Sequence, residues 1–329
     1  MALTATDEEV TPEAAWIGLD PSSNRIAQGP LVVAAFGADP PEGSVHFHLS
    51  IMSVVDGCVL SLPYDVSDQD VAAILGVAKR LETSTLTLVE GFGTNHGLVW
   101  EGGSLDLGTT PPDEADGASY RSALPQGDGE PILRRFIDDS VNLLGDLELN
   151  RIRQDDELPP LNCLWPWGHG MRPSLPNLWL ARGDRVHVES RSLRLAGLAR
   201  LAGYRHGRVR DFGRGTSIKL GWLAGLSDEV AIIAIEEIEA FRAQGMLEEA
   251  DWLVQEIDRQ FVTPWLDAPD GAPVDALVVA PGPDGGLALR FSSQHREEGL
   301  LPFDERALHE KLPTMAVHDV VASFLEALP

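Results

Sequence analysis

The sequence predicts an α/β protein in which a mostly parallel sheet lies between helices and carries an inserted α+β unit. After Trp167, short apolar runs typical of buried strands alternate with segments of helical periodicity. Before Trp167, alternating strands and an Asp56-Gly57 turn indicate hairpin pairing. We therefore expect residues 1–40 and 162–329 to form the core and residues 41–161 to form the insertion.

The elements expected in the first half come from local patterns. Ser67 is the predicted N-cap of a helix, with Asp70 three residues further on. Many Gly, Pro, Asp and Ser residues predict a long loop before the last helix of this half. In order, we expect a buried segment at 31–36, strands at 45–52 and 58–60, a helix at 66–81, strands at 83–89 and 97–100, a loop at 102–129 and a helix at 130–144.

The second half alternates between the two kinds of element. The expected order is a strand at 186–188, helices at 192–202 and 216–226, a strand at 229–235, a helix at 247–265, strands at 276–280 and 287–291, and a closing helix at 316–328. Near the N-terminus, only Trp16-Ile17 reads as part of a buried strand.

Composition narrows the class of protein. The 329 residues are 43% hydrophobic, which fits a soluble globular chain. A net charge of −26 argues against nucleic acid and anionic membrane as partners, because binding phosphate requires clustered Lys and Arg. No apolar run reaches membrane-spanning length. Two cysteines and an acidic N-terminus without signal-peptide features predict a cytoplasmic location.

The segment from Asn162 to Pro176 contains the most informative motif. It resembles the W-G-x-G-x-x-P-x-L-P segment of archaeal-type cofactor-independent (2,3-bisphosphoglycerate-independent) phosphoglycerate mutases, which are members of the alkaline phosphatase superfamily. Further similar segments occur in the family's order, at 28–31, 43–47, 55–57, 98–100, 109–112, 197–203, 256–259 and 300–303. The resemblance implies an alkaline-phosphatase-like core with an inserted domain.

The chemistry that the resemblance implies needs residues that the chain does not show. In the family, two divalent cations held by Asp and His activate a Ser or Thr nucleophile. Only Gly18-Leu19-Asp20 echoes the family's opening metal segment, so we expect the opening strand and the nucleophile to be missing. Where the family reads V-D-L-I-K-G, this chain has Leu193 at the acidic position and Ala196 at the catalytic lysine position.

The later metal-binding segments differ as well. Ala243 stands at the histidine position of the family's E-A-P-D-E-A-G-H segment, and 280–285 replaces its P-D-H-P-T-P segment with Pro and Gly. Glu239, Asp284 and His295 are the remaining candidates for metal ligands.

Three functional hypotheses remain open. The first is a non-catalytic relative without catalytic residues or a metal cofactor, which binds a phosphorylated small molecule or a protein partner. The second is a metal-dependent phosphoglycerate mutase or related phosphotransferase, using Mn or Zn at a site rebuilt around Glu239, Asp284 and His295. The third is a subunit that a separate polypeptide completes with the missing strand.

Three groups of residues are candidates for ligand binding. Trp167, His169 and Arg172 could form the rim of a phosphate-sugar pocket, or simply a structural turn. The loop at 213–219, with Arg214 and Lys219, could bind an anion at a helix N-terminus, or only cap that helix. His46 and His48 share one face of a predicted strand, where they could bind a metal or be buried.

Overall fold

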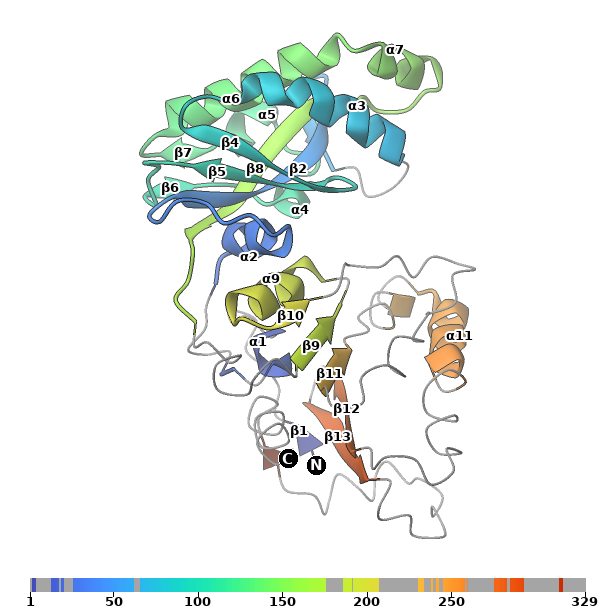
Figure 1. The fold of residues 1–329 in the computed structure, drawn as a ribbon. Coiled ribbons are helices and arrows are strands. Elements are labelled where there is room, and N and C mark those ends of the chain that lie inside the picture. The colour runs from blue at the N-terminus through green and yellow to red at the C-terminus, as the bar shows by residue number, and fades with distance from the viewer. Residues whose placement is uncertain are drawn as a thin grey trace. The chain divides into compact units, whose positions relative to one another are not determined.

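The computed structural model divides into two compact units, and each is described by itself (Figure 1). The first unit contains residues 26–177 and 196–202, and the second contains residues 1–25, 178–195 and 203–329. The residues that the structure describes are 2–3, 13–17, 19–20, 26–61, 66–175, 186–190, 192–206, 230–233, 238, 241–242, 245–257, 259, 275–282, 285–292 and 314–315. The first unit thus groups the predicted insertion with segments on both sides of it.

An antiparallel sheet forms the centre of the first unit. Its middle strand, β2 (Val45–Val55), pairs with β5 (Asn95–Trp100) on one side and with β8 (Cys163–Met171) on the other. β4 (Leu86–Phe92) pairs with β5, and β3 (Cys58–Leu60) folds back on β2. The turn between β2 and β3 has positive φ angles at Asp56 and Gly57, which confirms the predicted hairpin.

Helices cover both faces of this sheet (Figure 1). α3 (Asp68–Ala78), a 3₁₀ turn (Lys79–Leu81), α6 (Glu130–Gly145) and α7 (Glu148–Asp155) lie on one side, and α2 (Gln28–Ala35) packs on the other. The alternation of β2 directs Phe47, Leu49 and Ile51 into the core that also contains Leu133 and Ile137 of α6. Burial of these aliphatic and aromatic side chains supplies most of the stabilisation of the unit.

The N-terminus of α3 is formed as the sequence predicts. The Ser67 Oγ accepts a hydrogen bond from the Asp70 N–H (3.1 Å), and the Asp70 Oδ2 accepts one from the Ser67 N–H (3.4 Å). This reciprocal pair is a capping box, in which two backbone donors at the helix end are satisfied.

Some local expectations for this unit were incomplete. The segment at 102–129 is not a continuous loop, because it contains β6 (Leu107–Gly108), α4 (Pro112–Ala115), α5 (Tyr120–Ala123) and β7 (Gln126–Gly127). The buried segment at 31–36 is largely the helix α2, and α7 was not predicted.

The second unit contains the predicted parallel strands. β9 (Val186–Glu189) lies between β10 (Arg205–His206) and β11 (Val230–Ile233), and both pairings are parallel. A second sheet has the order β12 (Asp275–Gly282), β13 (Gly285–Ser292), β1 (Ala2–Leu3) and β14 (Thr314–Met315). The chain therefore has a mixed α/β fold.

The helices of the second unit agree only in part with the sequence. α11 (Leu247–Ile257) lies within the helix expected at 247–265, and α9 (Leu193–Leu201) starts in this unit and ends in the first. Trp16 is not in a strand as predicted but ends the short helix α1 (Glu13–Trp16). The helices expected at 216–226 and 316–328 lie outside the described residues. Among the described helices, none combines the length and apolar character needed to cross a bilayer.

Candidate functional site

The tryptophan-glycine motif forms a β-bulge in β8. His46 of β2 lies opposite Gly170, whereas His48 lies opposite Trp167, so β8 contains one more residue than β2 between these pairs. Gly168 has a φ of 60°, in the left-handed region that favours glycine. An extra residue with a left-handed glycine is the geometry of a G1 bulge. The bulge therefore explains the first glycine of W-G-x-G. The second, Gly170, has a different reason, which is its close packing against Ala27.

Because of the bulge, Trp167 and His169 lie on opposite faces of the sheet. In a regular strand, residues two apart share a face. Here the Trp167 ring packs 4.6 Å from the ring of His48, and its Nε1 donates to the Ser50 Oγ at 2.9 Å. The His169 ring instead stacks 5.8 Å from that of Phe47, which alternates with His48 along β2.

Both ring nitrogens of His169 form hydrogen bonds with neighbouring residues. Its Nε2 donates to the carbonyl oxygen of Leu105 (3.3 Å), and its Nδ1 accepts from the hydroxyl of Thr109 (3.3 Å). The same hydroxyl oxygen accepts from the Gly168 N–H at 3.2 Å. Arg172 lies beyond the strand end, where it is exposed and forms an ion pair with Asp39. The structure therefore does not bring Trp167 and His169 to a common rim.

Five other candidates cannot be placed in the fold. Arg214, Lys219, Glu239, Asp284 and His295 all lie outside the described residues. Within the described ranges, no group of three or more His, Cys, Asp or Glu side chains has an arrangement that could hold a metal ion.

His46 and His48 share the face of β2 that α2 covers, and both are buried. The His46 Nε2 donates to the Ser44 Oγ (3.0 Å), and the His48 Nε2 donates to the Asn95 Oδ1 (2.9 Å). Burial lowers the pKa of each to about 4, and the Arg172 charge acts in the same direction on the pKa of His46. Both rings are therefore neutral at pH 7, as a buried strand face requires.

A third buried histidine, His96 of β5, belongs to the same region. It lies beside Leu49 in the pairing of β2 with β5, and its Nδ1 accepts from the Gly91 N–H at 3.0 Å. Burial lowers the pKa of His96 to about 4 as well. The burial of His96 was not predicted from the sequence. The signal that could have indicated it is the position of His96 in the alternation of β5.

The motifs that carry the resemblance meet around α2. A Cβ atom on Gly29 of α2 would lie 2.2 Å from the carbonyl oxygen of His46, and one on Gly170 would lie 2.8 Å from the Cβ of Ala27. On the outer side of the helix, a Cβ on Gly197 of α9 would lie 2.0 Å from the carbonyl oxygen of Leu31. The Q-G-P-L, W-G-x-G and G-L-A-R-L-A-G segments thus form one packing interface that only glycine permits.

The middle of α9, from Leu195 to Ala199, is buried. The position that the resemblance assigns to a catalytic lysine holds Ala196, whose exposed fraction is 0%, and the same is true of Leu195 before it. Leu193, at the acidic position of the family segment, is half-buried. An unpaired ammonium or carboxylate at such positions would be costly to bury.

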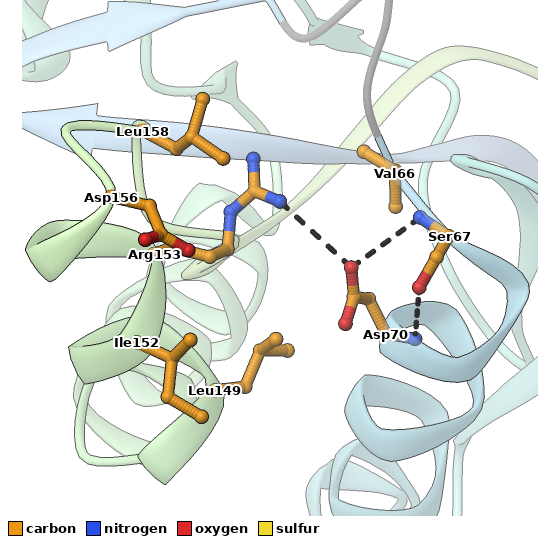
Figure 2. A pocket seen from close by; sticks show the side chains of 8 residues that line it. All are labelled: Val66, Ser67, Asp70, Leu149, Ile152, Arg153, Asp156 and Leu158. Atoms are coloured by element: carbon orange, nitrogen blue, oxygen red, sulfur yellow. Dashed lines mark hydrogen bonds and ion pairs between the residues drawn. The ribbon is translucent and has the colours of Figure 1, made fainter.

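A pocket of about 460 Å³ lies between α3 and α7 of the first unit (Figure 2). Its apolar lining comes from Val66, Leu149, Ile152 and Leu158. Its polar lining comes from Ser67, Asp70, Arg153 and Asp156. None of these residues belongs to the motifs that carry the resemblance, and the pocket was not predicted from the sequence.

The curated proteins that the chain matches are described as phosphoglycerate mutases. No family model matches the chain. A probable 2,3-bisphosphoglycerate-independent phosphoglycerate mutase of Geobacter sulfurreducens is 26% identical over 167 residues, which cover 48% of this chain and 41% of that protein. The 2,3-bisphosphoglycerate-independent phosphoglycerate mutase of Methanosarcina mazei is 23% identical over 299 residues, which cover 87% of this chain and 74% of that protein.

A solved structure extends the similarity to the fold. The cofactor-independent phosphoglycerate mutase from Thermoplasma acidophilum superposes with a TM-score of 0.60 at 18% identity, over 99% of this chain and 88% of that one. The Geobacter match spans 41% of the relative's own length, so it shows similarity in sequence, whereas the solved structure shows similarity in fold. The chain is thus similar in sequence to the 2,3-bisphosphoglycerate-independent phosphoglycerate mutases, and its mixed α/β fold resembles that of the solved cofactor-independent phosphoglycerate mutase.

Proposed function

We propose that this protein is a non-catalytic relative of the phosphoglycerate mutases that acts by binding a ligand or a partner. The observation that carries the proposal is the complete burial of Ala196 at the position where the resemblance implies a catalytic lysine. Phosphoryl transfer depends on cationic groups that neutralise the transferring phosphate. A methyl group inside a packed helix interface cannot supply that charge.

The retained motifs support the same proposal. Gly29, Gly170 and Gly197 are explained by the close packing of α2 between β2, β8 and α9. These residues preserve the scaffold whether or not chemistry takes place on it. The chain therefore keeps the parts that the fold needs, while the sequence differs at the positions to which the resemblance assigns chemistry.

The proposed ligand is a phosphorylated small molecule or a protein partner, with no metal cofactor required. Arg172, Arg214 and Lys219 are the cationic groups proposed for an anionic ligand, because guanidinium and ammonium groups bind phosphate. The net charge of −26 disfavours nucleic acid and anionic membrane. We also propose a cytoplasmic location, which the low cysteine content favours.

Titration calorimetry with 3-phosphoglycerate and inorganic phosphate tests the anion-binding part. We expect binding, and we expect Arg214→Gln to weaken it at least tenfold. Arg135→Gln is the control and should leave the affinity unchanged, because Arg135 lies on α6 in a surface pair with Asp139. Equal affinities in both variants would remove the loop at 213–219 from the proposed site.

Metal analysis of the purified protein separates the proposal from a working enzyme. We expect less than stoichiometric Mn and Zn after dialysis against each ion. Two metal ions per chain, and fewer in Glu239→Gln, would support a rebuilt two-metal site and would contradict the proposal.

A further inference from the structure

The pocket between α3 and α7 combines exposed aliphatic side chains with an exposed negative charge, while its one arginine is buried. Ile152 is 54% exposed and Leu158 is 37% exposed, although both line the same depression as the partly buried Leu149 (Figure 2). Single exposed aliphatics are ordinary on protein surfaces, whereas a concave group of them indicates a contact surface. Its volume of about 460 Å³ lies in the range of known binding pockets, roughly 300–1,000 Å³.

Three polar residues of the pocket, Ser67, Asp70 and Arg153, interact with one another. The carboxylate of Asp70 accepts from the Ser67 N–H and pairs with the Arg153 Nη1 at 3.8 Å, as Figure 2 shows. The guanidinium of Arg153 also donates through Nε to the carbonyl oxygen of Pro159 at 2.9 Å. Arg153 is only 5% exposed, so the cation of the pocket is directed into the protein. The apolar side chains and the Asp156 carboxylate are therefore what the pocket leaves for a partner to contact.

The charges that face solvent around this apolar area are negative. Asp156 at the end of α7 and Asp68 in the first turn of α3 are both exposed. Arg151 of α7 is paired with Glu148 at 3.0 Å and adds no net positive charge. A partner with Lys or Arg beside its apolar anchors would thus meet a complementary rim.

We propose that this pocket docks a basic amphipathic helix of a protein partner, whose aliphatic side chains insert between α3 and α7. Charge complementarity selects this occupant: a second copy of a chain with a net charge of −26 would bring acidic surface to an acidic rim. Aliphatic residues at helical spacing fit an open groove, and flanking Lys or Arg contact Asp156 and Asp68. The proposal concerns a surface separate from the mutase-like motifs and does not depend on the proposed function.

Fluorescence anisotropy with three labelled peptides of about 14 residues tests the docking surface. One peptide carries leucines at helical spacing with lysines elsewhere, the second replaces the lysines with glutamates, and the third replaces the leucines with serines. We expect the full-length protein to bind the leucine–lysine peptide and neither of the others. The affinity should fall with added salt, because surface charges are screened.

Matched variants locate the binding and exclude a general attraction to the acidic chain. Ile152→Ser should weaken binding at least tenfold, and Ile132→Ser should not, since Ile132 is a similarly exposed isoleucine on α6 outside the pocket. Asp156→Asn should weaken binding more than Asp155→Asn, which removes the same charge from the same helix end without changing the lining.

Four results would overturn the proposal. They are no binding of the leucine–lysine peptide, equal binding of the glutamate peptide, equal losses in the pocket and control variants, and self-association in sedimentation equilibrium that Ile152→Ser abolishes. Circular dichroism spectra of each variant establish that a loss of binding does not reflect unfolding.

Discussion

Gly197 of α9 lies directly against the backbone of Leu31 in α2. A Cβ atom at position 197 would come within 2.0 Å of the Leu31 carbonyl oxygen, a distance that real side chains do not adopt. The obstacle is backbone, so no side-chain rotation can relieve it. This contact joins two of the segments that carry the resemblance to the mutases, and it shows that the shared sequence of these segments has a packing explanation.

Replacing this glycine should therefore destabilise the protein. We expect Gly197→Ala to lower the free energy of unfolding by about 1–3 kcal/mol, the usual cost of overpacking. Gly76→Ala is the matched control, because Gly76 lies inside α3 and a methyl group there would have open space around it to 4 Å. It should raise stability by about 0.5–1 kcal/mol through helix propensity. Urea unfolding measures both, and a neutral Gly197→Ala would contradict the packing described.

Gly168→Ala should be destabilising for two separable reasons. The left-handed φ of 60° costs an alanine about 1–2 kcal/mol, and the new methyl group would lie 2.8 Å from the Gln28 Cβ. Gly43→Ala isolates the first cost, because Gly43 has a φ of 81° and open space around it. We expect the Gly168 variant to lose more stability than the Gly43 variant in the same urea series. Equal losses would mean that α2 does not pack closely on the bulge.

The three buried histidines predict a loss of stability in mild acid. Burial lowers the pKa of His46, His48 and His96 from 6.5 to about 4, so the unfolded chain binds more protons than the folded chain between these values. Stability is complete above about pH 6.5 and falls as the pH drops toward 4, by up to about 3 kcal/mol for each histidine.

Urea unfolding between pH 7 and pH 4.5 measures this dependence. His48→Gln removes one titrating ring and should reduce the slope of unfolding free energy against pH by up to about 1.4 kcal/mol per pH unit. A slope that His48→Gln leaves unchanged would show that this ring does not titrate below its ordinary pKa on folding.

Asn150 holds three backbone groups near the start of β8. Its Nδ2 donates to the carbonyl oxygens of Leu144 (2.8 Å) and Leu161 (3.2 Å), and its Oδ1 accepts from the Leu161 N–H (2.7 Å). Because Asn150 is 5% exposed, Asn150→Ala should leave buried groups unpaired and cost about 2–4 kcal/mol. Thermal unfolding checks this against Asn142→Ala, an exposed asparagine on α6 that should change stability by less than about 0.5 kcal/mol.

Local signals explain which elements could be predicted. The β2–β3 hairpin and the cap of α3 depend on residues close together in sequence, Asp56-Gly57 and Ser67 with Asp70, and both predictions are confirmed. The helix α2 gave no helical period because residues 29–34 are buried on all sides between the sheet and α9. Its helical state follows from tertiary packing, which a local pattern does not contain.

The candidate site was harder to predict than the fold. Trp167 and His169 are two residues apart, so simple alternation places them on one face, and only the register against His46 and His48 reveals the bulge that separates them. The pocket between α3 and α7 could not be predicted, because it joins Asp70 to Arg153 across 83 positions of sequence, and α7 itself was not expected.

A turnover assay tests the central claim most directly. The protein, loaded in turn with Mn and Zn, is incubated with 2-phosphoglycerate and with 3-phosphoglycerate, and an active cofactor-independent mutase serves as the positive control. We predict no interconversion above the rate in metal-free buffer. Metal-dependent interconversion that Glu239→Gln abolishes would contradict the account, because it would show that the chain has rebuilt a catalytic site.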